Sequence, residues 1–362
     1  MRRLVQEAIS RVISRTTVAM AGAWVFGLAC IALLAAAPAP AHAAATTGTA
    51  TATAAAAATA TAAACPPPLP SAATKGPAPD RGLLWRVTRD GRSSWLFGTL
   101  HVGKPAWKQL GPRVSAALRA SDVLAVEIDP DDPGLAAALA ETGPPLVLSA
   151  ALQARLRRAY DSACINPTSL AALHPLLQVT TLTVLEARWL GLDVAYAQEH
   201  VLLAYSRRDD RGDGRGPGRH GATQAPLRVL ALETAAQQKS AMLPTDPAEA
   251  LNALEQGLAQ LEDPSGRRVL ARLARAWEQG DLDTLSSYEQ WCACATTEED
   301  RAQMRRLNDE RNPALADGIA AQHRAGLRVF AAVGALHMTG PAALPLLLAQ
   351  RGFRVERVVF GR

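Results

Sequence analysis

Short apolar runs alternate along the chain with longer stretches in which apolar residues recur every three or four positions, and these two patterns separate strands from helices. Short apolar, β-prone runs are typical of buried strands, and two of them flank Asp90-Gly91, a dipeptide that favours a tight hairpin turn. The predicted strands cover residues 83–89, 93–100, 123–128, 227–232, 328–333 and 354–360. Most of them therefore lie towards the two ends of the region from about 81 to 362.

Between these runs, apolar residues recur every three or four positions, the spacing that places them on one face of an α-helix. The predicted helices cover residues 114–120, 149–160, 169–190, 196–207, 247–262, 266–279, 298–324 and 342–350. Residues 207–224 are rich in Gly and charge, which predicts a solvated loop. We expect an α/β domain over 81–362 in which the N- and C-terminal strands form one mixed sheet and the helical middle is an insertion.

The first 80 residues have a different character. A basic start is followed by an almost purely apolar run at 18–37 and by small residues around Ala41-His42-Ala43. This order predicts a signal peptide over 1–43 and an exported, periplasmic or secreted, protein. An uncleaved membrane anchor is the alternative, because the apolar run is long enough to span a bilayer. The Ala/Thr- and Pro-rich stretch at 44–80 predicts a disordered linker.

Charge changes the picture little. The chain has 362 residues with 38 Lys+Arg and 33 Asp+Glu, a formal charge of +5. Four arginines and one glutamate lie within the first 43 residues, so the remainder carries only +2. Such a weak surplus argues against a nucleic-acid partner. Contact with a membrane is expected only through an uncleaved N-terminal segment.

The cysteines fit an oxidising compartment. Cys292 and Cys294 are separated by one residue, so they lack the two-residue spacing of a thioredoxin-like redox pair. We predict that one of them forms a disulfide with Cys164. Cys65 lies in the predicted linker.

Two similar segments carry the candidate chemistry. Each has the pattern Gly-x-Leu-His after a predicted strand, one ending at His101 and the other at His337. Glycine lets a ligand or another backbone approach closely, and strand ends are where an α/β sheet opens to ligands. An imidazole at such a place can bind a metal or exchange a proton near neutral pH.

Two carboxylates follow other predicted strands, Glu127 after Val126 and Glu233 after Leu232. Two imidazoles and one carboxylate form a familiar set of ligands for a divalent metal and leave a position for water. This predicts His101, His337 and Glu127 as ligands. An imidazole separation above about 10 Å would exclude a shared ion. The alternative is structural: hydrogen-bonded histidines and glutamates that begin helices.

Several blocks, taken together, resemble the TraB/GumN family, which is related to the Tiki membrane proteases that act on Wnt. The blocks are Gly98-Thr99-Leu100-His101, Val126-Glu127, Leu232-Glu233-Thr234 with Gln237-Gln238, Arg311-Asn312, and Val333 to His337 continuing to Gly352-Phe353. The resemblance covers nearly all of 83–360. It implies a peptidase-like fold with a divalent metal such as manganese, cobalt or zinc at the two Gly-x-x-His motifs.

One block departs from the family pattern. The family usually has Gly, a hydrophobic residue and an acidic residue before a helix, whereas this chain has Ala197-Gln198-Glu199-His200. Because the glycine is missing, the sequence does not establish whether the turn has the family geometry or whether the acidic residue of this block, Glu199, reaches the site.

These observations predict an exported metal-dependent hydrolase, peptidase-like, acting on a peptide or protein. Glu127 would be a metal ligand or general base, and Glu233 and Arg311 would orient the other groups. A simple helix cap is the alternative role for Arg311. The alternative functions are a non-catalytic metal-, haem- or peptide-binding protein of the same fold, or a regulatory partner protein.

Overall fold

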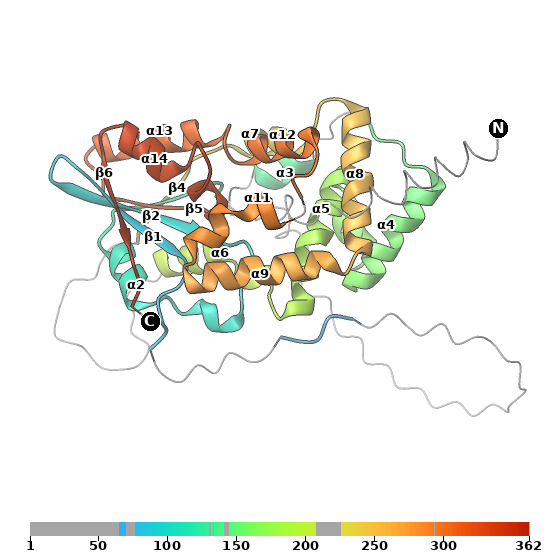
Figure 1. Ribbon diagram of the computed structural model, residues 1–362, viewed down its shortest axis with the longest axis horizontal. Coiled ribbons are helices and arrows are strands. Elements are labelled where there is room, and N and C mark those ends of the chain that lie inside the picture. The colour runs from blue at the N-terminus through green and yellow to red at the C-terminus, as the bar shows by residue number, and fades with distance from the viewer. Residues whose placement is uncertain are drawn as a thin grey trace, which may run out of the picture.

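The computed structural model describes residues 65–69, 77–129, 132, 134–140, 145–207, 226–292 and 294–361. The predicted signal peptide, most of the predicted linker and nearly all of the loop predicted at 207–224 lie outside these residues. The described chain forms one mixed sheet with helices on both faces and a further group of helices beside it, as Figure 1 shows. The prediction of an α/β fold is therefore confirmed.

All six strands belong to a single sheet in the order β4-β3-β5-β2-β1-β6. Their bounds are β1 Leu83–Arg89, β2 Arg92–Thr99, β3 Val123–Val126, β4 Arg228–Ala231, β5 Val329–Gly334 and β6 Arg354–Val358. Strands β2, β5, β3 and β4 run parallel, whereas β1 is antiparallel to both of its neighbours. The carboxyl ends of the four parallel strands therefore meet at one edge of the sheet.

The hairpin between β1 and β2 forms as its sequence predicts. Asp90 and Gly91 have φ values of 51° and 71°, so both central residues are left-handed. Such turns match the twist of the two strands, and Asp-Gly tolerates them at low cost. The turn sets the register that places Leu83 opposite Gly98.

Helices pack on both faces of the sheet. Helices α13 (Asn312–Arg324) and α14 (Leu344–Gln350) lie above it in Figure 1, and α2 (Pro112–Arg119) lies below. Strand β5 is buried along its whole length because it lies in the middle of the sheet between these layers. This burial explains its continuous apolar sequence.

The remaining helices form two insertions, one on each side of β4, where the sequence predicted a single helical middle. The first contains α3 Leu135–Ala140, α4 Ala150–Ala163, α5 Pro175–Leu185 and α6 Gln198–Ser206. The second contains α7 Ala235–Met242, α8 Pro247–Glu262, α9 Ser265–Gln279, α10 Leu282–Ser286, α11 Tyr288–Trp291 and α12 Glu298–Leu307 before α13. Short 3-10 helices are η3 Pro105–Lys108, η4 Pro167–Leu170, η5 Glu186–Leu190, η6 Val194–Tyr196 and η7 Ala335–Met338. The two insertions meet where α4, α5 and α8 pack together, at the right of Figure 1.

Two predicted helices are interrupted. The prediction of one continuous helix over 298–324 is wrong. Helix α12 ends at Leu307, and α13 begins at Asn312 with Pro313 in its first turn. Proline fits a first turn but not a helix interior, which explains the break. The helix predicted at 169–190 is likewise divided, because α5 starts after His174, whose Nδ1 accepts from the Leu176 backbone N–H at 3.2 Å.

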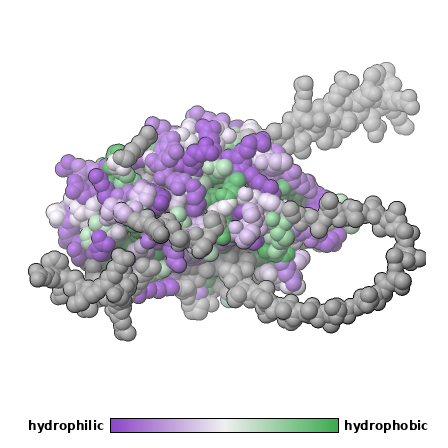
Figure 2. Space-filling view, turned by 90° about the horizontal axis from the view of Figure 1, so that it is seen from below, coloured by the Kyte–Doolittle hydropathy of each residue, from purple (hydrophilic) through white to green (hydrophobic). Residues whose placement is uncertain are grey.

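The surface is mainly hydrophilic in the view of Figure 2, with scattered hydrophobic areas. Among the large hydrophobic residues that the structure describes, Val147, Leu346 and Val359 are the exposed ones. Over the same described residues, no helix has the length and apolarity needed to cross a bilayer.

The predicted disulfide between Cys164 and Cys292 or Cys294 is wrong. Cys164 pairs with Cys65, and Cys292 pairs with Cys294. Cys164 is an exposed residue at the C-terminal cap of α4, whereas Cys292 and Cys294 lie in the core beside α12. Spacing along the chain does not reveal which thiols meet in space, and Cys65 was assigned to a linker with no partner.

We expect non-reducing peptide mapping to find this pairing. Digestion should yield one cross-linked pair of peptides containing Cys65 and Cys164. A single peptide containing Cys292 and Cys294 should lack both thiol hydrogens. Any cross-link between Cys164 and the 292–294 segment would contradict the pairing.

Candidate functional site

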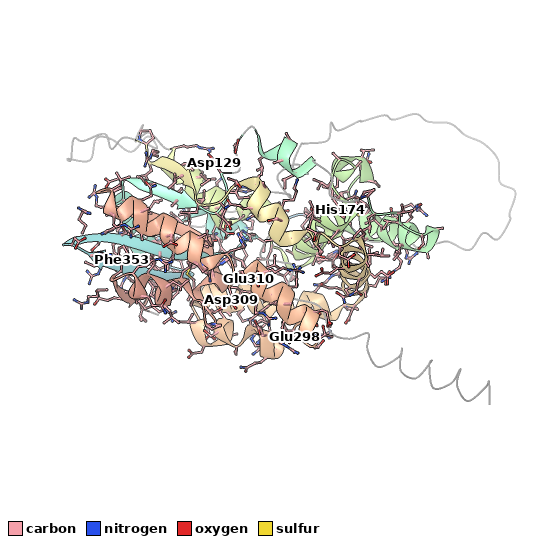
Figure 3. All side chains as sticks on the ribbon, turned by 90° about the horizontal axis from the view of Figure 1, so that it is seen from above. Asp129, His174, Glu298, Asp309, Glu310 and Phe353 are labelled. Atoms are coloured by element: carbon pink, nitrogen blue, oxygen red, sulfur yellow. A yellow bond between two sulfur atoms is a disulfide. The ribbon has the colours of Figure 1, made fainter. Side chains whose placement is uncertain are left out.

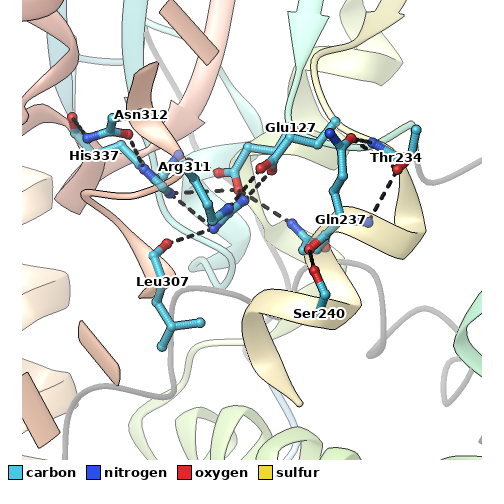
Figure 4. A network of polar contacts seen from close by, with 11 residues as sticks. Glu127, Thr234, Gln237, Ser240, Leu307, Arg311, Asn312 and His337 are labelled. Carbon is cyan, nitrogen blue, oxygen red and sulfur yellow. Dashed lines mark hydrogen bonds and ion pairs between the residues drawn. The ribbon is translucent and has the colours of Figure 1, made fainter. Parts of the chain in front are cut away.

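The parallel strands bring the predicted site residues to one edge of the sheet. His101 lies two residues after β2, Glu127 directly after β3, and Glu233 two residues after β4. His337 lies in η7, which directly follows β5. Because these strands are neighbours in the sheet, residues from distant parts of the sequence meet in the network drawn in Figure 4.

Both histidines flank one point above Gly334. A Cβ atom added to Gly334 would lie 3.7 Å from His101 Nε2 and 3.4 Å from His337 Cδ2. It would also lie 3.3 Å from Glu127 Oε1, and the Gly334 backbone N–H donates to that same oxygen at 2.7 Å. The two imidazoles are thus closer together than the distance of about 10 Å that would exclude a shared ion. The lack of a side chain at Gly334 lets these three groups approach one another around its Cα atom.

Arg311 is the central cation of the network (Figure 4). Its Nη2 donates to Glu127 Oε2 at 2.5 Å and also to Glu233, while its Nε donates to Glu233 Oε1 at 2.9 Å. Its Nη1 donates to the Leu307 carbonyl at 2.8 Å and lies 3.3 Å from His337 Nε2. The side chains of all three charged residues are at most 7% exposed. Arg311 is therefore a buried partner of two carboxylates, so its side chain does more than cap a helix.

Asn312 determines which nitrogen of His337 carries the proton. The Asn312 amide nitrogen donates to the backbone carbonyls of Ala342 at 2.9 Å and His337 at 3.3 Å. Its amide oxygen therefore faces His337 Nδ1, at 2.6 Å, and accepts from it. With Nδ1 protonated, Nε2 keeps its lone pair and accepts from Arg311. Burial, opposed by Glu127 and reinforced by Arg311, lowers the pKa of His337 to about 3, so the ring is neutral.

The two strand-end carboxylates have different electrostatic environments. Burial favours a raised pKa for Glu127, but the charge of Arg311, the two histidines and the Gly334 N–H outweigh it and lower the pKa to about 2. For Glu233, burial is stronger than the hydrogen bonds and charge of Arg311, so its pKa is raised. Glu127 is thus held firmly as an anion.

Glu199 is a further buried carboxylate at the site. Its Oε1 lies 3.0 Å from His101 Nδ1, on the opposite side of the ring from the Nε2 that faces Gly334. Burial favours a raised pKa for Glu199, but His101 outweighs it and lowers the pKa. The preceding Ala197 has φ of −53° and ψ of 141°, a conformation open to any residue. The absence of a glycine at that turn therefore does not prevent Glu199 from reaching His101.

Sequence reasoning missed Asn312 as a functional residue and left Glu199 in question. The signal for Glu199 was an acidic residue at the start of a helix in a family block. The only signal for Asn312 in the sequence was its position beside Arg311. Its hydrogen-bond partner His337 lies 25 residues away, so the sequence did not reveal their contact.

The other described histidines lie elsewhere. His174 sits among the helices remote from the sheet, well separated in Figure 3 from Asp309 and Glu310, which precede Arg311. His200 Nδ1 contacts the Val194 carbonyl. His323 is fully buried, where its ring contacts Ser94 Oγ at 2.8 Å and the Arg89 carbonyl at 3.1 Å. His220 lies outside the described residues.

A comparison of the sequence with protein-family models finds a match that contains all of the site residues described above. The model of the TraB/PrgY/gumN family matches residues 83–212 and 219–357. The chain belongs to this family. The match includes all of β1 to β5 and all but the last residue of β6, so the residues around Gly334 lie on the framework of the family. Comparison with curated proteins and with solved structures gives no match in either set.

The residues around Gly334 fit a divalent metal in their chemistry. Two imidazoles and a carboxylate, the residue types that bind a catalytic metal, lie around Gly334, with His101 presenting Nε2 and His337 presenting Cδ2 to this point. Within the described part of the chain, no three His, Cys, Asp or Glu side chains are already grouped as metal ligands. Instead Arg311 supplies the cation between Glu127 and His337. A metal at this point would share Glu127 with Arg311.

Replacing Gly334 with alanine tests whether a metal binds at this point. We expect bound divalent metal to fall at least tenfold, on the scale of losses seen when groups around a metal are disturbed. The backbone φ at Gly334 is −48°, so alanine introduces no backbone strain. The melting temperature should therefore move by only a few degrees. Metal content and thermal unfolding would be measured on the same preparation.

The matched control is Gly318→Ala, in the interior of α13, where the added Cβ would contact Leu232 rather than the site. This variant should keep its metal content. Equal metal loss in both variants would contradict a metal site beside Gly334.

Proposed function

We propose that this protein is an exported metal-dependent hydrolase that cleaves a peptide or amide bond. The observation that carries the proposal is the convergence of both Gly-x-x-His motifs, with Glu127, around Gly334. His101, His337 and Glu127 would hold the ion. Family membership supports the fold of such an enzyme, and the donor set supports its chemistry.

Each residue of the network has a definable task in this proposal. Asn312 holds the His337 ring with Nδ1 protonated, so Nε2, which accepts from Arg311 in this structure, is the nitrogen that would bind the ion. Glu199 holds the His101 ring from the Nδ1 side, which leaves Nε2 facing Gly334. Second partners of this kind fix the orientation of metal-binding histidines.

A manganese, cobalt or zinc ion held by these residues would supply Lewis-acid activation of water and of a substrate carbonyl. Glu127 would serve as a ligand or as the general base for the attacking water. Arg311 neutralises Glu127 and Glu233, and it holds Glu233 in a fixed orientation through two hydrogen bonds. A substrate carbonyl would have to reach this edge of the sheet, because the described site side chains are themselves buried.

The proposed location is outside the cytoplasm. The predicted signal peptide at 1–43 lies outside the described residues. Two disulfides support an oxidising compartment, since such bonds are rare in the cytosol. Intact-mass measurement of the protein from its own host tests the location: cleavage after Ala43 supports export through a signal peptide. A mass that includes Met1 would favour the membrane anchor.

The hydrolase proposal is tested by incubating the full-length protein with a peptide library and manganese, cobalt or zinc. We expect metal-dependent cleavage that falls at least about 100-fold in Glu127→Gln, the scale of losing a general base or an essential ligand. Glu262→Gln is the control, because Glu262 is an exposed residue of α8 that pairs with Arg155. Metal binding without turnover of peptides would favour the binding-protein alternative.

A further inference from the structure

The Cys292–Cys294 disulfide has features that a purely structural bridge does not need. It joins cysteines only two positions apart, whereas Cys65–Cys164 spans 99 positions. A disulfide stabilises a fold mainly by restricting the unfolded chain, and this effect is larger for a long closed loop than for a short one. The bond between Cys292 and Cys294 therefore contributes little to the stability of the fold. We therefore expect the protein to stay folded when this bond is reduced.

The two sulfurs have different surroundings. Cys294 lines a surface cleft between α8 and α12, together with Asn252 and Gln256 of α8 and Gln303 and Arg306 of α12. Cys292 does not line this cleft. Both cysteines are buried, Cys292 completely and Cys294 with 1% of its surface exposed, so a small thiol that enters the cleft comes closer to Cys294 than to Cys292.

The Cys292 sulfur is the better leaving group. The backbone N–H of Cys294 donates to Cys292 Sγ at 3.1 Å. A hydrogen-bond donor stabilises the negative charge that develops on a departing thiolate, and a stabilised thiolate leaves faster. Access and hydrogen bonding thus assign opposite roles to the two sulfurs.

We infer that Cys292–Cys294 is a thiol–disulfide exchange site for low-molecular-weight thiols, with Cys294 as the attacked sulfur. The thiolate of the incoming thiol forms a bond to Cys294 Sγ, the bond between the two cysteines breaks, and Cys292 leaves as a thiolate and takes up a proton. A second thiolate of the same class attacks the incoming sulfur of the mixed disulfide. This step releases a small disulfide and the Cys294 thiolate, which is protonated. The two small thiols are oxidised and the protein disulfide is reduced.

Single-cysteine variants of the full-length protein test these roles. Each variant is incubated with oxidised glutathione, and glutathione attached to the remaining thiol is measured by peptide mass spectrometry. We expect Cys294 in C292S to form the mixed disulfide at least about tenfold faster than Cys292 in C294S. The intact Cys65–Cys164 bridge serves as the internal control in both proteins. Equal rates, or faster reaction at Cys292, would overturn the assignment.

A second measurement uses the wild-type protein and covers the case in which a variant fails to fold. Reduced glutathione is added, free thiols are alkylated at intervals, and the thermal unfolding of the product is recorded. We expect glutathione attached at Cys294 as the intermediate, followed by two free thiols at 292 and 294 in a protein that still unfolds cooperatively. Attachment at Cys292, no reaction at either cysteine, or loss of the fold on reduction would contradict the inference.

Discussion

Replacing His337 with alanine is expected to remove bound divalent metal and with it any hydrolytic activity. His337 is one of two imidazoles that flank Gly334, and a site with one ligand fewer holds its ion far more weakly. The same result is expected for His101→Ala. Elemental analysis of the purified full-length proteins, together with peptide turnover, measures the effect.

The stability of the His337 variant should also fall. The ring is 1% exposed, and its removal leaves the Asn312 amide oxygen without its donor. An unsatisfied buried polar group costs about 1–3 kcal/mol, more than a surface histidine would cost. Loss of stability alone therefore does not identify a ligand.

His323→Ala provides the matched control. His323 is equally buried and bonded to Ser94 and the Arg89 carbonyl, but it lies away from the site. We expect this variant to lose comparable stability and to retain its metal. Metal retained in both His101→Ala and His337→Ala would exclude the proposed centre, whatever the change in stability.

Replacing Arg311 with alanine is expected to destabilise the protein by about 3–5 kcal/mol, the usual cost of leaving buried charges without their partner. Arg311 is the shared cation of Glu127 and Glu233, and all three side chains are at most 7% exposed. Chemical denaturation at pH 7 measures the loss. Arg328→Ala is the control, because Arg328 forms an exposed pair with Asp122, and its removal should cost at most about 1 kcal/mol.

The dependence on pH should separate the Arg311 variant from the wild type. In the wild type the pKa of Glu127 is lowered from 4.5 to about 2, so its contribution to stability is present above pH 4.5 and is lost as the pH falls towards 2. Without Arg311 the pKa values of Glu127 and Glu233 in the folded state should exceed their unfolded values. Protonation then relieves the buried charges, so the deficit relative to the wild type should shrink on acidification. A deficit that is constant from pH 7 to 4 would contradict this account.

Much of the fold was evident in the sequence because it depends on neighbours in the chain. Asp90-Gly91 predicted the hairpin, and apolar periodicity located every strand and most helices. The break between α12 and α13 was missed as a helix end, although Pro313 and the polar run at 308–312 mark it. Short-range sequence patterns reflect local backbone preferences. They therefore predict that a helix or strand exists more accurately than they predict where it ends.

Part of the candidate site could also be predicted from the sequence, because its residues follow predicted strands. His101, Glu127, Glu233 and His337 each follow a strand, so a parallel sheet brings them to one edge once the strand order is known. Only the tertiary structure decided that Arg311 bonds to both glutamates and that Asn312 sets the proton of His337. It also decided the partner of Cys164, which is 99 residues away. Such contacts depend on how distant elements pack, and no local pattern of side chains encodes which of several chemically equivalent partners will meet.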